Sequence, residues 1–528
     1  MKRNRQSKAI RAGNPLVFTK SIDTIQGLGT KDDSSLTLQF VQVTVQDDHP
    51  PKTTTTTTTN KPRINVLGYG IYNPHSPMYK VRMLCHKSLQ PTLCREITTE
   101  LQQNHHQHDT VNTRSNTIPK LPSDRNSVTT QLIRHVVQYH LSVALAKRRA
   151  IGLHIRGQTK NTNTRNDHPT TDTFRWVNGE GDGLSGLAID ILQGGNIAVV
   201  MSSASWVQHY QEAITIAIQK VLLHQLLQQH LQNEQVAAMD QTHHMSSSSS
   251  STTYDSVQVI WKSTQSRLQQ DGYEFPSPND GTWLEPDPIP QHETQRVICR
   301  ENGILYATYP FADGQKTGVY CDQRDNRLMV AKHCYNKRVL DLCTYHGGFA
   351  LNALLNGNAR YVTAVDSSAN AIAALQENAQ LNEIPTTQLE CIQSDITRFL
   401  QTECHGSNSE ERQYDVVILD PPKLAPSMAA LEKGRRKYHG LNRDAIKVIN
   451  QRAGGLLCTC TCSAAMTQKE GGQYFVNMVH AAAMAAQRQV TLLQVSGAAP
   501  CHVESPIAWP AGSYLTAALF YVHPIESN

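Results

Sequence analysis

The segment 338–366, RVLDLCTYHGGFALNALLNGNARYVTAVD, constrains the fold more than any other part of this 528-residue chain. It reads in order as a strand, a glycine turn, a helix, a second strand and a terminal acid: 339–342, Gly347–Gly348, 349–355, 361–365 and Asp366. Glycines let a backbone approach a ligand closely, and an acid at the end of the second strand is placed to bond two ribose hydroxyls. The turn is not G-x-G-x-x-G, so the segment predicts a nucleotide-type α/β fold without favouring a dinucleotide.

Three further strands continue this alternation of strand and helix: 389–393, 416–419 and 456–461. Polar or acidic residues follow them, among them Asp395, Asp420 and Cys462. Together with Asp366, these residues stand at successive strand ends of one predicted parallel sheet. Because ligands of open α/β sheets bind at the carboxyl ends of the strands, the pattern predicts a cofactor site at that edge.

The glycine turn, Asp366, Asp395 and the Asp-Pro-Pro sequence at Asp420 occur in an order that resembles class I S-adenosylmethionine-dependent methyltransferases. Longer motifs are similar to one bacterial family, the PUA-domain-containing cytosine-5 methyltransferases of large-subunit ribosomal RNA (methyltransferase I type). These motifs are GNPLVF (13–18), GYGIYNPHSPMYKVRML (68–84), EGDGLSGLAID (180–190), GQKTGVYCDQRDNR (314–327), CTYHGGFA (343–350), LDPPKL (419–424) and TCSAAM (461–466).

The resemblance implies an α/β protein whose Rossmann-like, seven-stranded methyltransferase domain follows two smaller domains. The predicted limits are 8–88 for a PUA-like RNA-binding β domain, 89–127 for a polar linker, 128–300 for a central α/β domain with low-complexity inserts, and 301–528 for the methyltransferase domain. The apolar stretches 490–497 and 513–522 are placed to form a final antiparallel strand pair. The segment near 47–62, with its run of threonines, is predicted to be a disordered insertion.

S-adenosyl-L-methionine is the cofactor that the resemblance implies. Tyr345 and the two glycines would cradle its methionine end, Asp366 would hold the ribose, and Asp395 would face the adenine. The full set of cofactor-binding residues implied in this way is Gln323, Arg324, Thr344, Tyr345, Gly347, Gly348, Asp366, Ser367, Asp395, Ile396 and Asp420.

The chemistry of cytosine methylation indicates two catalytic residues. Carbon 5 of cytosine is a weak nucleophile until a thiolate adds at carbon 6 and makes carbon 5 enamine-like; an acid near ring nitrogen 3 compensates charge. We predict Cys462 as the nucleophile and Asp420 as the acid. Cys458 and Cys460 alternate with Cys462 along one strand and are predicted to be core residues. No metal site is predicted, because this alternation does not supply the usual Cys-x-x-Cys turn.

Two other functions remain open at this point. Asp-Pro-Pro also resembles the motif of enzymes that methylate exocyclic amines, in which the acid and a backbone carbonyl bind the amino group without a cysteine. The chain is also compatible with a non-catalytic RNA-binding or ribosome assembly protein.

RNA, and large-subunit rRNA in particular, is the partner that the resemblance implies. Asn326, Lys423 and Tyr438 are the predicted substrate-binding residues. Lys423 and the run Arg435–Tyr438 form a basic segment with a terminal aromatic residue, which suits phosphate binding and stacking of a flipped base. A solvated charged face is the alternative. The net charge of +5 permits a nucleic acid partner without demanding one.

The remaining sequence features concern the environment of the chain. The 12 cysteines lack regular spacing and predict reduced thiols of an intracellular protein. No apolar run approaches the length of a membrane span, and the N-terminal stretch lacks the apolar segment of a secretory signal. We therefore expect a cytoplasmic protein without a membrane partner, with an organelle not excluded and a homodimer suggested by the family alone.

Overall fold

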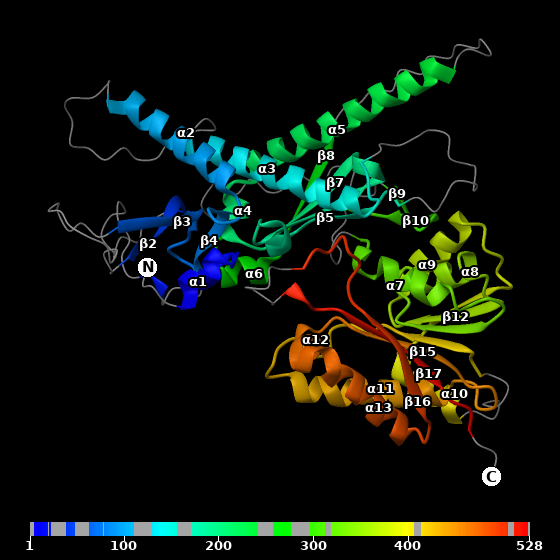
Figure 1. Cartoon of the computed structure of the whole chain (residues 1–528). Coiled ribbons are helices and arrows are strands. Elements are labelled where there is room, and N and C mark those ends of the chain that lie inside the picture. Colours follow the sequence, from blue (N-terminus) through cyan, green and yellow to red (C-terminus); the bar gives the residue numbers. More distant parts are fainter. Residues whose placement is uncertain are drawn as a thin grey trace. The chain divides into compact units, whose positions relative to one another are not determined.

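The computed structural model describes residues 5–18, 21–22, 38–47, 63–77, 79–109, 128–155, 171–240, 257–275, 296–311, 318–405, 413–504 and 512–525 (Figure 1). The chain divides into two compact units. Unit 1 comprises Met1–Gln158, Phe174–His292 and Val503–Pro510, and unit 2 comprises Thr159–Thr173, Glu293–His502 and Ala511–Asn528.

Unit 2 contains a seven-stranded sheet with the strand order β13-β12-β11-β14-β15-β17-β16. All neighbours pair in parallel except β17, which runs antiparallel to both β15 and β16. The strands are β11 (Arg338–Leu342), β12 (Tyr361–Asp366), β13 (Leu389–Gln393), β14 (Val416–Leu419), β15 (Gly455–Thr461), β16 (Val490–Ser496) and β17 (Thr516–Val522). The predicted antiparallel pair at the end of the chain is thereby confirmed.

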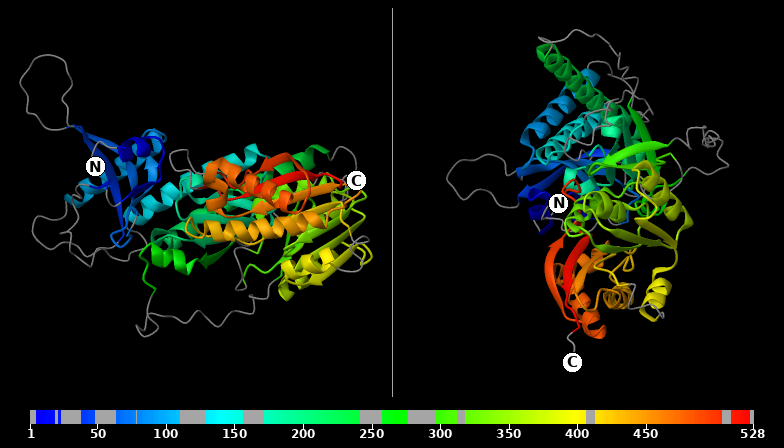
Figure 2. Two further views of the ribbon diagram at one scale, coloured as in Figure 1. Left: turned by 90° about the horizontal axis from the view of Figure 1, so that it is seen from below. Right: turned by 90° about the vertical axis from the view of Figure 1, so that its right-hand side faces the viewer.

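Helices cover both faces of this sheet, as the unbroken apolar sequences of its central strands require. One buried cluster joins the sheet to α10 (Ile396–His405), α11 (Leu431–Lys447) and α13 (Gln473–Ala485). The other joins it to α7 (Arg324–Ala331), α8 (Gly348–Leu355) and α9 (Ala369–Leu381). Figure 1 shows α8 and α9 on one side and α11 and α13 on the other, and Figure 2 shows the same layering from two further directions. The short helix α12 (Ala464–Gln468) follows β15.

A two-stranded hairpin, β9 (Val297–Glu301) and β10 (Ile304–Thr308), packs against the α8 and α9 face of unit 2. Its turn places Asn302 at φ 54° and Gly303 at φ 80°, so both central residues occupy the left-handed region that such hairpins favour. The hairpin thereby brings buried polar residues against the first turns of α7 and α8.

Unit 1 contains two four-stranded sheets. The first is antiparallel with the order β1-β4-β3-β2, and the second has the order β5-β6-β7-β8 with β7 and β8 parallel. Their strands are β1 (Leu16–Phe18), β2 (Gln39–Asp47), β3 (Arg63–Tyr72), β4 (Tyr79–His86), β5 (Phe174–Asn178), β6 (Leu187–Leu192), β7 (Ile197–Ser202) and β8 (Gln258–Ser263). The helices of unit 1 are α1 (Arg5–Arg11), α2 (Pro91–Asp109), α3 (Val128–Ala150), α4 (Ser205–His209), α5 (Gln211–Asp240) and α6 (Gln265–Gln270).

The linker prediction for 89–127 is wrong over its first half, because the structure forms helix α2 there. The polar composition concealed a short apolar face: Leu93, Cys94 and Ile97 are at most 4% exposed, at helical spacing. The rest of the predicted linker and the predicted insertion after Asp47 lie outside the described residues.

The prediction that all cysteines are reduced is also wrong, since the structure joins Cys85 of β4 to Cys94 of α2 by a disulfide. The start of α2 folds back on β4 and brings the two Cα atoms to 6.4 Å. The other ten cysteines all belong to unit 2. No helix among the described residues is both long and apolar enough to cross a membrane.

Candidate active site

The turn after β11 combines two unusual backbone conformations with a glycine. Cys343, Tyr345 and Gly347 have φ values of 64°, 52° and 89°, which lie in the left-handed region that non-glycine residues avoid. Hydrogen bonds to the next strand hold the turn: the Cys343 and Thr344 amides donate to the Val365 carbonyl. Because such strained backbone clusters at functional sites, the turn is the first element of the candidate site.

The two glycines of the turn are required by packing. A Cβ on Gly347 would lie 2.2 Å from Leu375 Cδ1 of α9, and one on Gly348 would lie 2.5 Å from Arg327 Nε of α7. We expected them to let a ligand approach the backbone. The structure shows that their missing side chains also let α7 and α9 approach α8, and the approach of a ligand stays a prediction.

Thr344 lies beneath the turn and is 5% exposed. Its hydroxyl donates to Asp341 Oδ2 at 2.7 Å, and the Ala350 amide donates to the same oxygen at 3.0 Å. Burial raises the pKa of Asp341 to about 6. This arrangement supports the turn from below, so the side chain of Thr344 is committed to the protein.

Asp366 ends β12 beside the turn and is partly exposed. Its Oδ2 accepts a hydrogen bond from the Tyr345 amide (3.0 Å), and its Oδ1 accepts one from the Ser368 amide (2.9 Å). A carboxylate oxygen has two lone pairs, so each oxygen retains an acceptor site. Ser367 beside it is exposed. These donors and acceptors fit the ribose of a nucleoside cofactor.

Asp395 and Ile396 follow β13. Asp395 is exposed, and its Oδ1 accepts from the Thr397 and Arg398 amides at 2.9 and 3.1 Å, which caps α10. Ile396 belongs to the core that packs α10 on the sheet. The other carboxylate oxygen of Asp395, Oδ2, is therefore the atom that could accept a hydrogen bond from a ligand.

Asp420 follows β14, and its carboxylate accepts a hydrogen bond from Gln323 Nε2 at 3.0 Å. Burial and the nearby Asp322 carboxylate raise the pKa of Asp420 to about 7, against the opposing effects of Arg327 and Gln323. A group with this pKa exchanges protons near neutral pH, as a general acid or base must.

Asn326 orients Gln323 and does not reach the site itself. Its amide nitrogen donates to Gln323 Oε1 (2.7 Å) and to the Gly497 carbonyl (3.0 Å), while Ser496 Oγ donates to its oxygen (2.7 Å). The residue is 2% exposed. The predicted contact between Asn326 and substrate is therefore wrong, because both polar ends of the side chain are bonded inside the protein.

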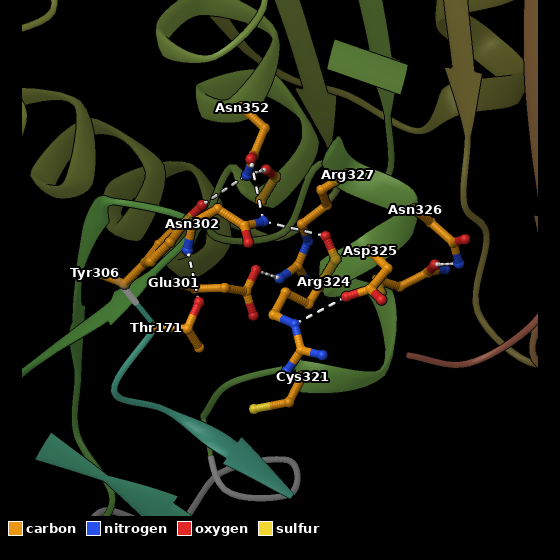
Figure 3. A network of polar contacts seen from close by, with 12 residues as sticks. Thr171, Glu301, Asn302, Tyr306, Cys321, Arg324, Asp325, Asn326, Arg327 and Asn352 are labelled. Atoms are coloured by element: carbon orange, nitrogen blue, oxygen red, sulfur yellow. Dashed lines mark hydrogen bonds and ion pairs between the residues drawn. The ribbon is translucent and has the colours of Figure 1, made fainter. Parts of the chain in front are cut away.

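Arg324 and Arg327 of α7 belong to a buried polar network (Figure 3). Arg324 Nε bonds Asp325 at 2.9 Å and its Nη1 lies 3.4 Å from Cys501 Sγ. Arg327 Nη1 pairs with Glu301 Oε1 at 2.5 Å, with both side chains at most 5% exposed. Arg324 is itself 6% exposed, so it supports the site from behind.

Two asparagines tie this network to the turn. Asn302 Nδ2 donates to the Arg324 carbonyl (3.1 Å) and lies 3.4 Å from Asn352 Oδ1. Asn352 Nδ2 donates to the Gly348 carbonyl at 2.8 Å. Sequence analysis missed Glu301, Arg327 and both asparagines. The available signal was Glu301, a charged residue at the same two-residue spacing as the apolar Val297 and Cys299 of β9.

Cys462 follows β15 directly and is partly exposed, whereas Cys458 and Cys460 are 0% exposed. The prediction that these two belong to the core is confirmed. β14 and β15 are parallel neighbours with Leu419 opposite Thr459, so Asp420 and Cys462 stand at adjacent strand ends. The two predicted catalytic residues therefore follow neighbouring strands at the same edge of the sheet, and Cys462 lies two residues beyond the position opposite Asp420.

Tyr438 of α11 is 0% exposed and cannot stack on a base, so that prediction is wrong. Its aromatic ring packs edge-on against Phe475 with centroids 5.9 Å apart. Lys423, by contrast, is exposed in the loop after Asp420. Helix α11 carries further exposed cations, namely Lys433, Arg436 and Lys437.

Comparison with known proteins identifies similar methyltransferases. A family model described as S-adenosylmethionine-dependent methyltransferase matches residues 203–474. The ribosomal RNA large subunit methyltransferase I of Aeromonas hydrophila is 37% identical over 224 residues, which span 42% of this chain and 53% of that protein. The Escherichia coli (strain K12) protein of the same name is 28% identical over 348 residues, 65% of this chain and 73% of that protein.

Two solved structures share the fold. A methyltransferase crystallised with SAH has a TM-score of 0.58 at 16% identity, covering 97% of each chain. A SAM-dependent methyltransferase from Streptococcus mutans has a TM-score of 0.58 at 15% identity, covering 99% of each chain. S-adenosylmethionine is therefore the cofactor, and the chain belongs to the S-adenosylmethionine-dependent methyltransferase family.

Proposed function

We propose that this protein methylates carbon 5 of a cytosine in large-subunit ribosomal RNA. The observation that carries the proposal is that Asp420 and Cys462 follow the adjacent parallel strands β14 and β15, with the pKa of Asp420 raised to about 7. The relatives named above are rRNA methyltransferases, which supports RNA as the substrate.

The proposed cofactor-binding surface consists of the turn after β11 and the ends of β12 and β13. Asp366 would accept hydrogen bonds from the ribose, Asp395 would face the adenine, and Tyr345 would border the methionine end. The bound cofactor supplies an electrophilic methyl group. Gln323 would hold the Asp420 carboxyl in place at the edge of this surface.

In the proposed reaction, the Cys462 sulfur adds to carbon 6 of the base and forms a covalent bond. Asp420 donates a hydrogen bond or a proton at ring nitrogen 3, which stabilises the charge that this addition creates. Carbon 5 then takes the methyl group, whose bond to the cofactor sulfur would break and leave S-adenosylhomocysteine. Carbon 5 gives its proton to water, the Cys462 thiolate leaves as the carbon 5–carbon 6 double bond returns, and any proton on ring nitrogen 3 returns to Asp420.

RNA would bind through two surfaces. Lys423 follows Asp420 by three residues and α11 carries further exposed cations, and we assign these side chains to RNA phosphates. The β1–β4 sheet of unit 1 would act as the PUA-like RNA-binding domain, within the domain limits predicted from the sequence. The cellular location would follow the ribosome that is modified, in the cytoplasm or in an organelle. A homodimer remains a proposal drawn from the family.

Analysis of the methylated nucleoside tests the proposed function. Full-length protein is incubated with S-adenosylmethionine carrying a labelled methyl group and with large-subunit rRNA fragments, and the RNA is digested to nucleosides. We expect the label in 5-methylcytidine. Label in an amine-methylated nucleoside would overturn the proposal in favour of amine chemistry at Asp420. Binding of RNA without transfer would favour a non-catalytic role.

The pH dependence of single-turnover methyl transfer tests the role of Asp420. As the acid, Asp420 must be protonated, so the rate is expected to fall as the pH rises through about 7. The hydrogen bond from Gln323 lowers the pKa of Asp420; Gln323→Leu should therefore raise this pKa and move the falling limb to higher pH. The exposed Gln473, whose amide bonds Asn477, provides the control Gln473→Leu, which should leave the limb in place. An unshifted limb in Gln323→Leu would contradict the assignment.

A further inference from the structure

The hydroxyl of the buried Tyr438 joins two segments that carry the proposed catalytic residues. It accepts a hydrogen bond from the Leu424 amide at 3.4 Å and one from Thr461 Oγ1 at 2.9 Å. It also lies 3.1 Å from Ser463 Oγ. Leu424 belongs to the loop that leaves Asp420, whereas Thr461 and Ser463 are the residues on either side of Cys462.

Ser463 makes a second connection between the same two segments. Its hydroxyl accepts a hydrogen bond from the Ala425 amide at 3.2 Å, and its own amide donates to Thr461 Oγ1 at 3.2 Å. Thr461, Ser463 and Tyr438 are all 0% exposed. Because these hydrogen bonds are shielded from water, a donor or acceptor that loses its partner has no water to replace it, and the full desolvation cost of that group remains.

Close packing of α11 keeps the Tyr438 hydroxyl in position. A Cβ on Gly434, one helical turn before Tyr438, would lie 2.7 Å from Ala425 Cβ and 2.9 Å from the Leu424 carbonyl. The missing side chain lets the helix lie directly on the Leu424–Ala425 loop. On the far side, the Phe475 ring fixes the tyrosine ring. The hydroxyl therefore has little freedom to leave its three partners.

We propose that Tyr438 is a positioning residue that sets the Cys462 sulfur and the Asp420 carboxyl at a constant separation. The inference rests on the proposed function. It assigns to Tyr438 the relative placement of Cys462 and Asp420, which neither catalytic residue can fix by itself. Two of the residues between Asp420 and Leu424 are prolines, Pro421 and Pro422, so a tether at Leu424 restrains Asp420 through a stiff segment. Holding two reactive groups in one geometry raises the rate of a step that requires both.

The test compares Tyr438→Phe with Tyr414→Phe. Tyr414 is a matched control, because it lies in the same buried cluster, is 3% exposed, and bonds Glu403 Oε2 at 3.4 Å through its hydroxyl. Each variant loses one buried hydroxyl and keeps its ring. Only Tyr438→Phe removes a bond to the loops that carry Asp420 and Cys462.

Two measurements on the full-length variants are needed. The first is amide hydrogen exchange of the peptide that contains Leu424 and Ala425, which reports the tether without any need for catalysis. We expect this peptide to exchange about tenfold faster in Tyr438→Phe, which is the change that loss of one net hydrogen bond produces. Its exchange rate should be unchanged in Tyr414→Phe. The second is methyl transfer to rRNA fragments, for which we expect kcat to fall about tenfold in Tyr438→Phe. The KM for RNA and the Kd for S-adenosylmethionine should not change.

The outcomes separate this inference from the proposed function. Unchanged exchange at Leu424 overturns the tether, and faster exchange with wild-type kcat overturns its positioning role. If kcat falls equally in Tyr438→Phe and Tyr414→Phe, Tyr438 contributes only as a core residue, and this result also overturns the inference. If wild-type protein produces no 5-methylcytidine, the proposed function fails, while the exchange measurement still decides whether Tyr438 joins the two loops.

Discussion

Cys462→Ala is expected to lower methyl transfer to RNA by at least about 10³-fold, because the variant lacks the nucleophile that makes carbon 5 reactive. The expected effect is larger than for any other single change at the edge of the sheet. RNA that contains 5-azacytidine provides a direct readout, since a base with nitrogen at position 5 cannot lose a proton there and keeps the enzyme attached. Wild-type protein should form an adduct that survives denaturant, and Cys462→Ala should form none.

Cys458→Ala is the matched control for this experiment. Cys458 lies in β15, four residues before Cys462, and is 0% exposed in the core. Its loss should cost about 1 kcal/mol of stability by leaving a small cavity, and the adduct should still form. An adduct in Cys462→Ala, or nearly full methyl transfer without the thiol, would contradict the cytosine-5 mechanism and favour amine methylation through Asp420.

Arg327→Met is expected to destabilise unit 2 by about 3–5 kcal/mol, because it leaves the Glu301 carboxylate buried and without its cation. Arg327 also packs against Gly348, so its loss removes a contact beneath the turn after β11. Urea unfolding followed by hydrogen exchange of the β11 and β12 amides measures the effect within unit 2.

The double variant Glu301→Gln/Arg327→Met should recover much of that loss, since no uncompensated charge then remains. Arg435→Met provides the exposed counterpart: Arg435 pairs with Glu432 at 3.3 Å with side chains 38% and 64% exposed. Its loss should cost less than about 1 kcal/mol. If Arg327→Met proves as mild as Arg435→Met, the buried pair does not stabilise the site.

The strand ends at Asp366, Asp395 and Asp420 could be predicted because the determinants are local. A short continuous apolar run is typical of a strand buried on both faces, and the polar residue that follows the run marks where the parallel strand ends. The parallel order then brings the strand ends to one edge of the sheet without further information, so Asp420 and Cys462 follow neighbouring strands. The same reasoning identified Cys458 and Cys460 as core residues.

The roles of Tyr438 and Asn326 could not be predicted with the same reasoning. Tyr438 stands in a basic run, and its neighbours suggested a surface. Residues Leu431, Gly434 and Tyr438 nonetheless share one face of α11 at helical spacing, and that face is buried. The rotation of the helix on the sheet, rather than the composition of the run, decided which side chains are exposed and which face the core.

The sequence alone determined the α/β class, the edge of the sheet proposed to bind the cofactor, and the two proposed catalytic residues. Tertiary structure alone decided the disulfide between Cys85 and Cys94, the buried pair of Arg327 with Glu301, and the bonds of the Tyr438 hydroxyl. The physical reason is the separation of the partners along the chain. Strands, turns and their ends depend on neighbouring residues, whereas these contacts exist only after packing has brought separate elements together.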